Sequence, residues 1–242
     1  MLTSLVPADA TSLDLEQEAD RDLVAELYRP PRPDWVRLNL IGSISGSAAG
    51  TDGTSETLTN PTDRLILRSI RNLADVVVVG AASVRAEGYF VPRFAALAVV
   101  TGSGDLSGHR ITTETSSGSR GPLLVVTCAG SVDTVRRTLG DTPATILVVT
   151  DVAQRLAASD ILAALRAAGY RSVVCEGGPT LAAQFVDSGL VDEICLTTTP
   201  MVNGGALPLF GGSSFTERRL SLTQLLADEQ DCLYARWAVT EP

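Results

Sequence analysis

VCEGGPTLAAQF, residues 174–185, joins an apolar run to a stretch with the spacing of a helix. Gly177 and Gly178 follow the run, Pro179 stands where the helix would begin, and Gly189 follows its end. Glycines let the backbone approach a ligand closely, and the free N–H groups and dipole of a helix start favour a phosphate. The segment therefore predicts a buried strand, a tight turn that fits a dinucleotide pyrophosphate, and a helix. For the glycines alone, an ordinary strand-to-helix turn is the alternative.

Similar apolar runs recur along the chain. They are VVVVG (76–80), LAVVT (97–101), LLVVT (123–127), ILVVT (146–150) and SVVC (172–175). Continuous β-branched runs without alternation are typical of parallel strands that are buried on both faces. Helical patterns separate most of these runs, so the sequence predicts an α/β fold with helices on both faces of a mostly parallel sheet.

The clearest helix is expected over residues 60–74. Asn60 can cap it, Pro61 suits its first position, and Asp63 favours the positive end of the helix dipole. A further helix is expected within SDILAALRAAGY, residues 159–170, with Ser159 or Asp160 as its cap and Gly169 as its stop.

The two ends of the chain differ from this pattern. LDLEQEADRDLVAELY (13–28) predicts an extra amphipathic helix, and VRLNLIGS (36–43) predicts a strand. The stretch 218–239 reads as two strands around a polar turn, which we expect to form an antiparallel edge pair. We therefore divide the chain into a helical arm with a linker, 1–34, and one domain of about nine strands, 35–242.

The composition limits the partners. The chain has 242 residues, 45% of them hydrophobic, which is enough for a substantial core. A formal charge of −9 argues against nucleic acid, whose binding relies on basic patches. The apolar runs are far shorter than the roughly 20 residues that span a bilayer, and the N-terminal stretch lacks the basic region of a signal peptide. We expect a cytoplasmic protein that binds a small molecule.

The sequence offers few candidate residues for a metal site or for an acyl-transfer triad. The chain has one histidine, His109, so a multi-histidine metal site is excluded. Its four cysteines lie far apart without a C-x-x-C pair and read as small buried hydrophobic residues. No G-x-S-x-G nucleophile elbow is present. We expect no bound metal.

A second junction repeats the opening pattern. In VVVVGAASVRAEGY, residues 76–89, Gly80 directly follows an apolar run and Ser83 places a hydroxyl at a short helix start. Gly80 alone is a weak signal, and structural punctuation is its alternative interpretation. Two such junctions in one parallel sheet indicate a ligand groove at the carboxyl ends of the strands, where Glu176 would also lie.

These segments carry a resemblance. EGGPTLAAQFVDSGLVDEICLTTTPMVNGGALPLF (176–210), together with the second junction and LNLIGSISGSAAGTDGTSETLTNPTDRLILRSIR (38–71), resembles the reductase domain of riboflavin biosynthesis. The resemblance runs from about Trp35 to the C-terminus and implies the dihydrofolate-reductase fold, a three-layer α/β/α arrangement. The arm is similar to that of stand-alone actinobacterial members, and the zinc signature of a fused deaminase domain, H-x-E with P-C-x-x-C, is not found.

The resemblance implies a reaction and a set of residues. Members of the family reduce the ribosyl group of 5-amino-6-(5-phosphoribosylamino)uracil to a ribityl chain with NADPH, and they form homodimers. Glu176 would face the substrate as a proton donor or hydrogen-bond anchor. The residues expected at the cofactor are Gly80, Ser83, Thr57, Thr101, Gly177, Gly178, Pro179, Thr180 and Leu181. The residues expected at the substrate are Ser55, Arg71, Arg93 and Glu176.

Two departures keep other functions open. Ser45 stands where many relatives have the aspartate of S-x-D-G, and Asn39 stands where bifunctional members often have lysine. A pterin reductase of the dihydrofolate type is therefore one alternative, and a nucleotide-binding sensor without turnover is another. Arg71 and Ser55 favour the riboside reductase, because a phosphoribosyl group needs such partners. A solvated stripe is the alternative for the neighbouring Arg64 and Arg68.

Overall fold

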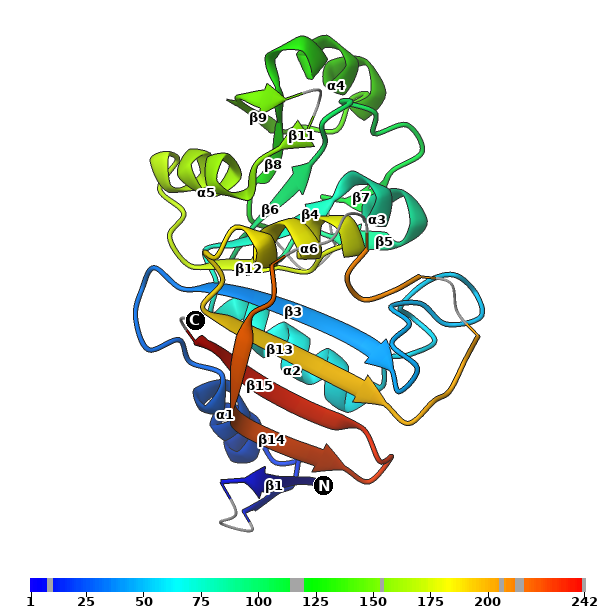
Figure 1. Cartoon of the computed structure of the whole chain (residues 1–242), viewed down its shortest axis with the longest axis vertical. Coiled ribbons are helices and arrows are strands. Elements are labelled where there is room, and N and C mark those ends of the chain that lie inside the picture. The colour runs from blue at the N-terminus through cyan, green and yellow to red at the C-terminus, as the bar shows by residue number, and fades with distance from the viewer. Residues whose placement is uncertain (8–10, 114–119, 153–154, 205–206, 212–215, 241–242) are drawn as a thin grey trace.

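The computed structural model describes residues 1–7, 11–113, 120–152, 155–204, 207–211 and 216–240. Within them one eleven-stranded sheet runs through the molecule, with helices on both of its faces (Figure 1). Across the sheet the strands follow the order β2 (Ser12–Leu13), β1 (Leu2–Val6), β14 (Arg219–Asp228), β15 (Leu233–Thr240), β13 (Glu193–Thr199), β3 (Val36–Ser43), β12 (Val173–Cys175), β4 (Val76–Gly80), β6 (Ala96–Val100), β8 (Leu123–Cys128) and β9 (Thr145–Val149).

The predicted parallel strands form the larger part of this sheet. The strands from β13 to β9 are parallel to one another, and they include all the valine-rich runs. The α/β class is confirmed, but the expected nine strands are too few. Short strands that lack a valine-rich run were missed. Four of them form two small sheets, in which β5 (Gly88–Phe90) pairs with β7 (Arg110–Thr112) and β10 (Asp151–Val152) pairs with β11 (Arg155–Leu156).

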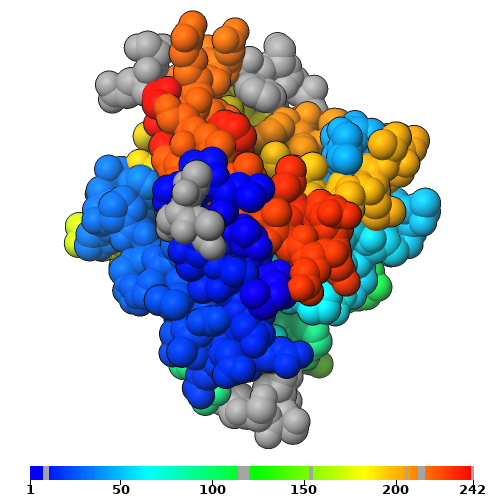
Figure 2. Space-filling view, turned by 90° about the horizontal axis from the view of Figure 1, so that it is seen from below, coloured from blue at the N-terminus to red at the C-terminus, as the bar shows by residue number. Residues whose placement is uncertain are grey.

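The C-terminal strand pair is present but does not form the edge of the sheet. β14 and β15 are antiparallel, as predicted. However, β1 pairs with β14, and β2 pairs with β1, so the start of the chain covers the expected edge. Figure 2 shows this N-terminal segment lying against the C-terminal strands. The arm, predicted as helical, therefore contributes two strands before its helix.

The helices begin and end close to the predicted positions. They are α1 (Glu18–Leu27), α2 (Pro61–Asn72), α3 (Ala81–Ala86), the 3-10 turn η1 (Ala129–Ser131), α4 (Val132–Leu139), α5 (Ala158–Ala167) and α6 (Pro179–Asp187). The Asn60 side chain caps α2 by accepting a hydrogen bond from the Asp63 N–H at 2.8 Å. α5 begins at Ala158, two residues earlier than a cap at Ser159 implies, and Ala157 holds its N-cap position without a side-chain cap. Gly169 follows its end with φ +96° as predicted.

Three buried clusters hold the layers together. α5 and α6 pack on one face of the sheet, and α1 to α4 pack on the other. In Figure 1, α6 lies in front of the sheet and α2 behind it. No helix of the described residues is long and apolar enough to cross a bilayer. Because the parallel strands end together, their carboxyl ends form one edge that both helical layers flank.

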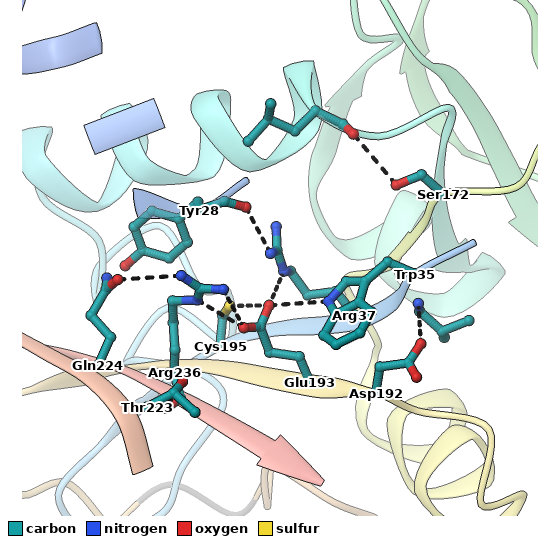
Figure 3. Close-up of polar contacts among 12 residues, drawn as sticks. Tyr28, Trp35, Arg37, Ser172, Asp192, Glu193, Cys195, Thr223, Gln224 and Arg236 are labelled. Carbon is teal, nitrogen blue, oxygen red and sulfur yellow. Dashed lines mark hydrogen bonds and ion pairs between the residues drawn. The ribbon is translucent and has the colours of Figure 1, made fainter. Parts of the chain in front are cut away.

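A buried ion cluster lies at the opposite, amino ends of the strands (Figure 3). Glu193 accepts a hydrogen bond from Nε of Arg37 at 2.5 Å and another from Nε of Arg236 at 2.8 Å. Arg37 also donates to the Tyr28 carbonyl at 2.8 Å, and Arg236 donates to the Leu27 carbonyl. These carbonyls end α1, so the cluster fastens the N-terminal helix to the sheet.

Candidate active site

The two glycine junctions meet at the carboxyl ends of β4 and β12. The strands are neighbours, and the Gly80 N–H donates to the Gly177 carbonyl at 2.7 Å. The Gly178 N–H donates to the Ser83 hydroxyl at 3.1 Å, which links the start of α3 to the start of α6. Gly177 has φ +84°, a conformation that favours glycine. Segments that lie about a hundred residues apart in the sequence thus form one surface.

The start of α6 has the features of an anion-binding site. Gly178 has no side chain to cap the helix, and Pro179 has no N–H. The backbone N–H groups of Thr180 and Leu181 have no hydrogen-bond partner among the residues that the structure describes. A Cβ added at Gly178 would lie 3.0 Å from the Ser83 hydroxyl, so a side chain there would crowd Ser83. Backbone donors without a partner at a helix start can bind a phosphate oxygen.

Glu176 and Arg71 form a two-bond ion pair. Nε and Nη2 of Arg71 donate to the two carboxylate oxygens of Glu176 at 2.6 and 2.7 Å. The Glu176 side chain is 6% exposed and the Arg71 side chain is 23% exposed. Burial lowers the pKa of Arg71, but the charge and hydrogen bonds of Glu176 outweigh burial and raise it. The sequence placed both residues at the substrate, and the structure shows that they contact each other.

Tyr89 lies against this pair and was missed at the sequence level. The Arg71 guanidinium lies 5.8 Å from the centre of the Tyr89 ring. Burial, and next the charge of Glu176, raise the pKa of the Tyr89 phenol well above its usual value, so the hydroxyl remains a donor. The only signal was its place at the end of the quoted segment VVVVGAASVRAEGY, after the helix start.

Ser55 is held close to the end of α3. Its N–H and hydroxyl donate to the carboxylate of Glu87 at 2.8 and 3.0 Å. Glu87 is the C-terminal cap residue of α3, two residues before Tyr89. Glu87 therefore fastens the loop that follows β3 to the second junction. It was not singled out from the sequence, where it stands in the same segment.

Three other predicted residues make their contacts elsewhere. The exposed Thr57 hydroxyl donates to Asp52 at 3.0 Å within its own loop. Thr101 is buried, and its hydroxyl accepts a hydrogen bond from the Gly104 N–H at 3.0 Å. The Arg93 guanidinium lies 5.2 Å from the ring centre of Phe94, in an exposed stretch after β5. Their assignment to cofactor or substrate stays a prediction.

The departure at Ser45 has a clear structural partner. Its hydroxyl donates to the Asn203 carbonyl at 2.8 Å, and Ser43 donates to the Asn203 side chain at 2.8 Å. Asn203 also donates to the Ala49 carbonyl at 2.9 Å. Ser45 therefore joins the loops that follow β3 and β13. Asn39 is half-buried in β3, and it pairs in register with Cys195 of β13.

Asp63 is a second carboxyl group in this part of the fold. It was interpreted only as an acid suited to a helix start, yet it is 8% exposed. Its oxygens accept hydrogen bonds from the Thr197 hydroxyl at 2.7 Å and the Thr59 hydroxyl at 2.6 Å. The signal was its place on the apolar stripe of the helix with Ile66 and Ile70, which faces the sheet.

Known proteins match this chain over most of its length. The model of the RibD C-terminal domain family matches residues 34–234. The riboflavin biosynthesis protein RibD of Mycobacterium tuberculosis is 29% identical over 194 residues, which cover 76% of this chain and 50% of that protein. RibD of Bacillus amyloliquefaciens is 27% identical over 201 residues, which cover 79% and 54%. The chain spans about half the length of these curated relatives.

Solved structures share the fold. A pyrimidine reductase-like protein from Corynebacterium diphtheriae matches with a TM-score of 0.70 and 24% identity, over 90% of this chain and 99% of that one. The riboflavin biosynthesis reductase Rib7 of Saccharomyces cerevisiae matches with a TM-score of 0.60 and 16% identity, over 91% and 100%. The family match covers well over half of the sequence, so this chain belongs to the RibD C-terminal domain family, the reductase family of riboflavin biosynthesis.

Proposed function

We propose that this chain is an NADPH-dependent reductase that converts the ribosyl group of a phosphoribosylamino-pyrimidine into a ribityl chain. The observation that carries the proposal is the joining of both glycine junctions beside the Arg71–Glu176 pair, at one edge of the sheet. In open α/β sheets ligands bind at this edge. The family membership supplies the reaction class.

The residues at the two junctions fit a dinucleotide diphosphate. The N–H groups of Thr180 and Leu181 at the start of α6 have no partner among the described residues. Gly80 and Gly178 keep side chains out of the surface between α3 and α6, and the Ser83 hydroxyl offers a further polar contact. When bound, NADPH supplies the hydride that the substrate accepts at C1′.

The substrate side needs an oriented riboside and one proton. The riboside opens when its C1′–O4′ bond breaks, O4′ gains a proton and the exocyclic nitrogen loses one, which leaves a C1′=N double bond. As C1′ accepts hydride, the C=N electron pair moves to nitrogen, which takes up a proton from the protein. Arg71 and Ser55 are the proposed contacts of the phosphoribosyl group, and Glu176 orients Arg71 through its two hydrogen bonds.

A single assay separates this function from its alternatives. Purified protein is mixed with NADPH and either the phosphoribosylamino-pyrimidine or dihydrofolate, and the nicotinamide absorbance is followed. Loss of absorbance with the riboside alone supports the proposal. Oxidation of NADPH with dihydrofolate alone would favour the pterin reductase. If the protein binds NADPH but oxidises it with neither substrate, a nucleotide sensor would be favoured.

We also propose a homodimer. Large apolar side chains are exposed on the loops after β3 and β13, namely Ile44, Met201, Val202 and Leu207. These loops are joined, because the Ile44 N–H donates to the Met201 carbonyl at 2.9 Å. A second copy would cover this patch. Light scattering on Val202→Asp should then give the monomer mass, and an unchanged dimer mass would argue against this surface.

A cytoplasmic location belongs to the same proposal. All four cysteines are buried and free, which is typical of proteins that work in a reducing compartment.

A further inference from the structure

Asp63 holds a buried carboxyl group on the side of α2 that faces the sheet. Its partner Thr197 pairs with Ile41 close to the carboxyl ends of β13 and β3. Glu176 directly follows β12, the strand on the other side of β3. Asp63 and Glu176 therefore flank the same strand, close enough that the charge of Glu176 acts on Asp63.

The buried carboxyl groups of this chain differ in their counter-ions. Glu193 is paired with Arg37 and Arg236, and Glu176 is paired with Arg71. Within the described ranges no cationic side chain forms an ion pair with Asp63. The adjacent Arg64 is half exposed and pairs with Glu56. A buried carboxyl group without a counter-ion favours its neutral form.

The surroundings of Asp63 oppose its charge. Burial raises the pKa of Asp63, the hydroxyls of Thr59 and Thr197 and the charge of Arg64 lower it, and the charge of Glu176 raises it again, so that the pKa lies above its usual value. A hydroxyl group can donate to a carboxylate or accept from a carboxylic acid. Thr59 and Thr197 can therefore satisfy Asp63 in both protonation states.

We infer that Asp63 is the proton-holding residue of this site and that Glu176, fixed by Arg71, is a charged anchor. This inference rests on the proposed reductase function. Thr59 is half-buried whereas Asp63 and Thr197 are buried, so the Thr59 hydroxyl is the outlet for the proton. Asp63 gives one proton through Thr59 to the substrate nitrogen as the C=N electron pair arrives there, and solvent returns one proton to the carboxylate. A pair of carboxyl groups with opposite environments is a common acid–base arrangement.

Other charged and titratable groups lie around Asp63 or its capping neighbour Asn60. On α2, Arg64 is cationic, and Arg71 is bound to Glu176. In the turn between β14 and β15, burial raises the pKa of the Cys232 thiol. Burial also opposes the charge of Asp228 there, but hydrogen bonds from Tyr234 and Asn60 outweigh it and hold the pKa of Asp228 below its usual value.

The decisive variant is Asp63→Asn, which keeps the shape of the side chain and removes its proton. In the wild type, kcat should fall as the pH rises through the pKa of Asp63, because the acid form is then lost. In Asp63→Asn, kcat should be lower by about 10²-fold and this alkaline fall should disappear, while KM and the NADPH affinity stay unchanged. Asp133→Asn is the matched control, because Asp133 also lies in the first turn of a helix but is exposed, and it should behave as wild type.

A second variant tests the hydroxyl partners. Thr197→Val removes a hydrogen bond that stabilises the charged carboxylate, so the alkaline fall of kcat should move to higher pH and still be present. If the role of Asp63 is purely structural, Thr197→Val should lower the stability of the protein and leave the pH of this fall in kcat unchanged. An Asp63→Asn enzyme that keeps both its turnover and its alkaline fall would overturn the inference.

A measurement on the free protein separates this inference from the proposed function. The aspartate carboxyl carbons are labelled with ¹³C, and the Asp63 signal is assigned by its loss in Asp63→Asn. A titration midpoint clearly above the ordinary value of about 3.9 supports the inference, and a midpoint at or below it refutes the inference. If the riboside is not reduced but the midpoint is raised, the proposed function fails and the proton-holding state of Asp63 stands.

Discussion

Two arginine–glutamate clusters lie at opposite ends of the parallel strands, and they differ in what their arginines bond besides the glutamate. At the amino ends, Arg37 and Arg236 bond both oxygens of Glu193, and Arg37 also bonds the Tyr28 carbonyl (Figure 3). Arg236 bonds the Leu27 carbonyl at the end of α1. At the carboxyl ends, Glu176 is bonded by Arg71, whose Nη1 has no partner within the described part of the chain.

The difference distinguishes a structural cluster from one that can take a ligand. The Arg37 and Arg236 side chains are 2% and 14% exposed, whereas the Arg71 side chain is 23% exposed. A buried ion cluster whose arginines also bond backbone carbonyls is costly to break. A pair with a free donor at the edge of the sheet can bind an anion without losing its own bonds.

The largest effect is expected when the structural cluster is broken. Glu193→Gln leaves the buried Arg37 and the half-buried Arg236 without a counter-charge, so the free energy of unfolding should fall by about 3–5 kcal/mol. Folded Glu193→Gln should bind NADPH as the wild type does. Urea unfolding and a cofactor titration measure the two quantities. Glu229→Gln removes an exposed carboxylate that pairs with the N-terminus and is the control, expected to change stability little.

Glu176→Gln tests the other cluster. The substitution removes the negative charge that pairs with Arg71 and weakens the two hydrogen bonds that orient it. We therefore expect kcat/KM to fall by roughly 10²-fold, equivalent to about 2.7 kcal/mol, while the NADPH affinity stays nearly unchanged. Its free energy of unfolding should fall less than that of Glu193→Gln, because Arg71 can reach solvent. If Glu176→Gln lost stability and kept its turnover, the two clusters would have the same role and the comparison would fail.

A smaller effect is expected at the glycine junction. In Gly178→Val the added side chain meets the Ser83 hydroxyl, because even a Cβ would lie 3.0 Å from it. Overpacking costs about 1–3 kcal/mol, so NADPH should bind about ten- to a hundred-fold more weakly. Gly130→Val is the matched control, since Gly130 also follows a strand at a helix start but has open space around it. Normal NADPH affinity in Gly178→Val would remove the junction from the cofactor site.

The smallest effect concerns acid stability. Burial raises the pKa of Glu193, but Arg37 and Arg236 lower it further, so the folded-state pKa lies below its usual value. Glu193 therefore stabilises the fold above the unfolded-state pKa of about 4.3, and this contribution is lost as the pH falls through the folded-state pKa. Between pH 6 and pH 3, the free energy of unfolding should decrease less steeply with falling pH in Glu193→Gln than in the wild type. Unfolding curves recorded at each pH measure it. An equal slope in both proteins would contradict this.

The sequence was sufficient for elements whose signals are local. The valine-rich runs gave the parallel strands, and the pattern Asn60–Pro61 gave the start of α2. The strand β1 was missed because its pairing with β14 depends on contacts over two hundred residues away, which no local pattern encodes. β2 in turn pairs with β1. The candidate site was predicted at its glycines and at Glu176 from local patterns of the same kind.

What could not be predicted is how these side chains pair. Arg71 and Glu176 are 105 positions apart, and Thr197 lies 134 positions from Asp63. Sequence spacing places a residue on one face of a helix. The order of the strands in the sheet determines which strand, and therefore which side chains, that helix face contacts. The sequence placed Asp63 correctly at the start of a helix, but it did not show that Asp63 contacts Thr197 on the sheet.

The pairing of residues 2–6 with β14 has a practical consequence. The backbone of an uncovered outer strand is a template on which other chains can polymerise. Deleting this short segment would open a ten-residue strand to such growth, so shortened versions of the protein should be checked for aggregates before any loss of activity is blamed on the catalytic centre.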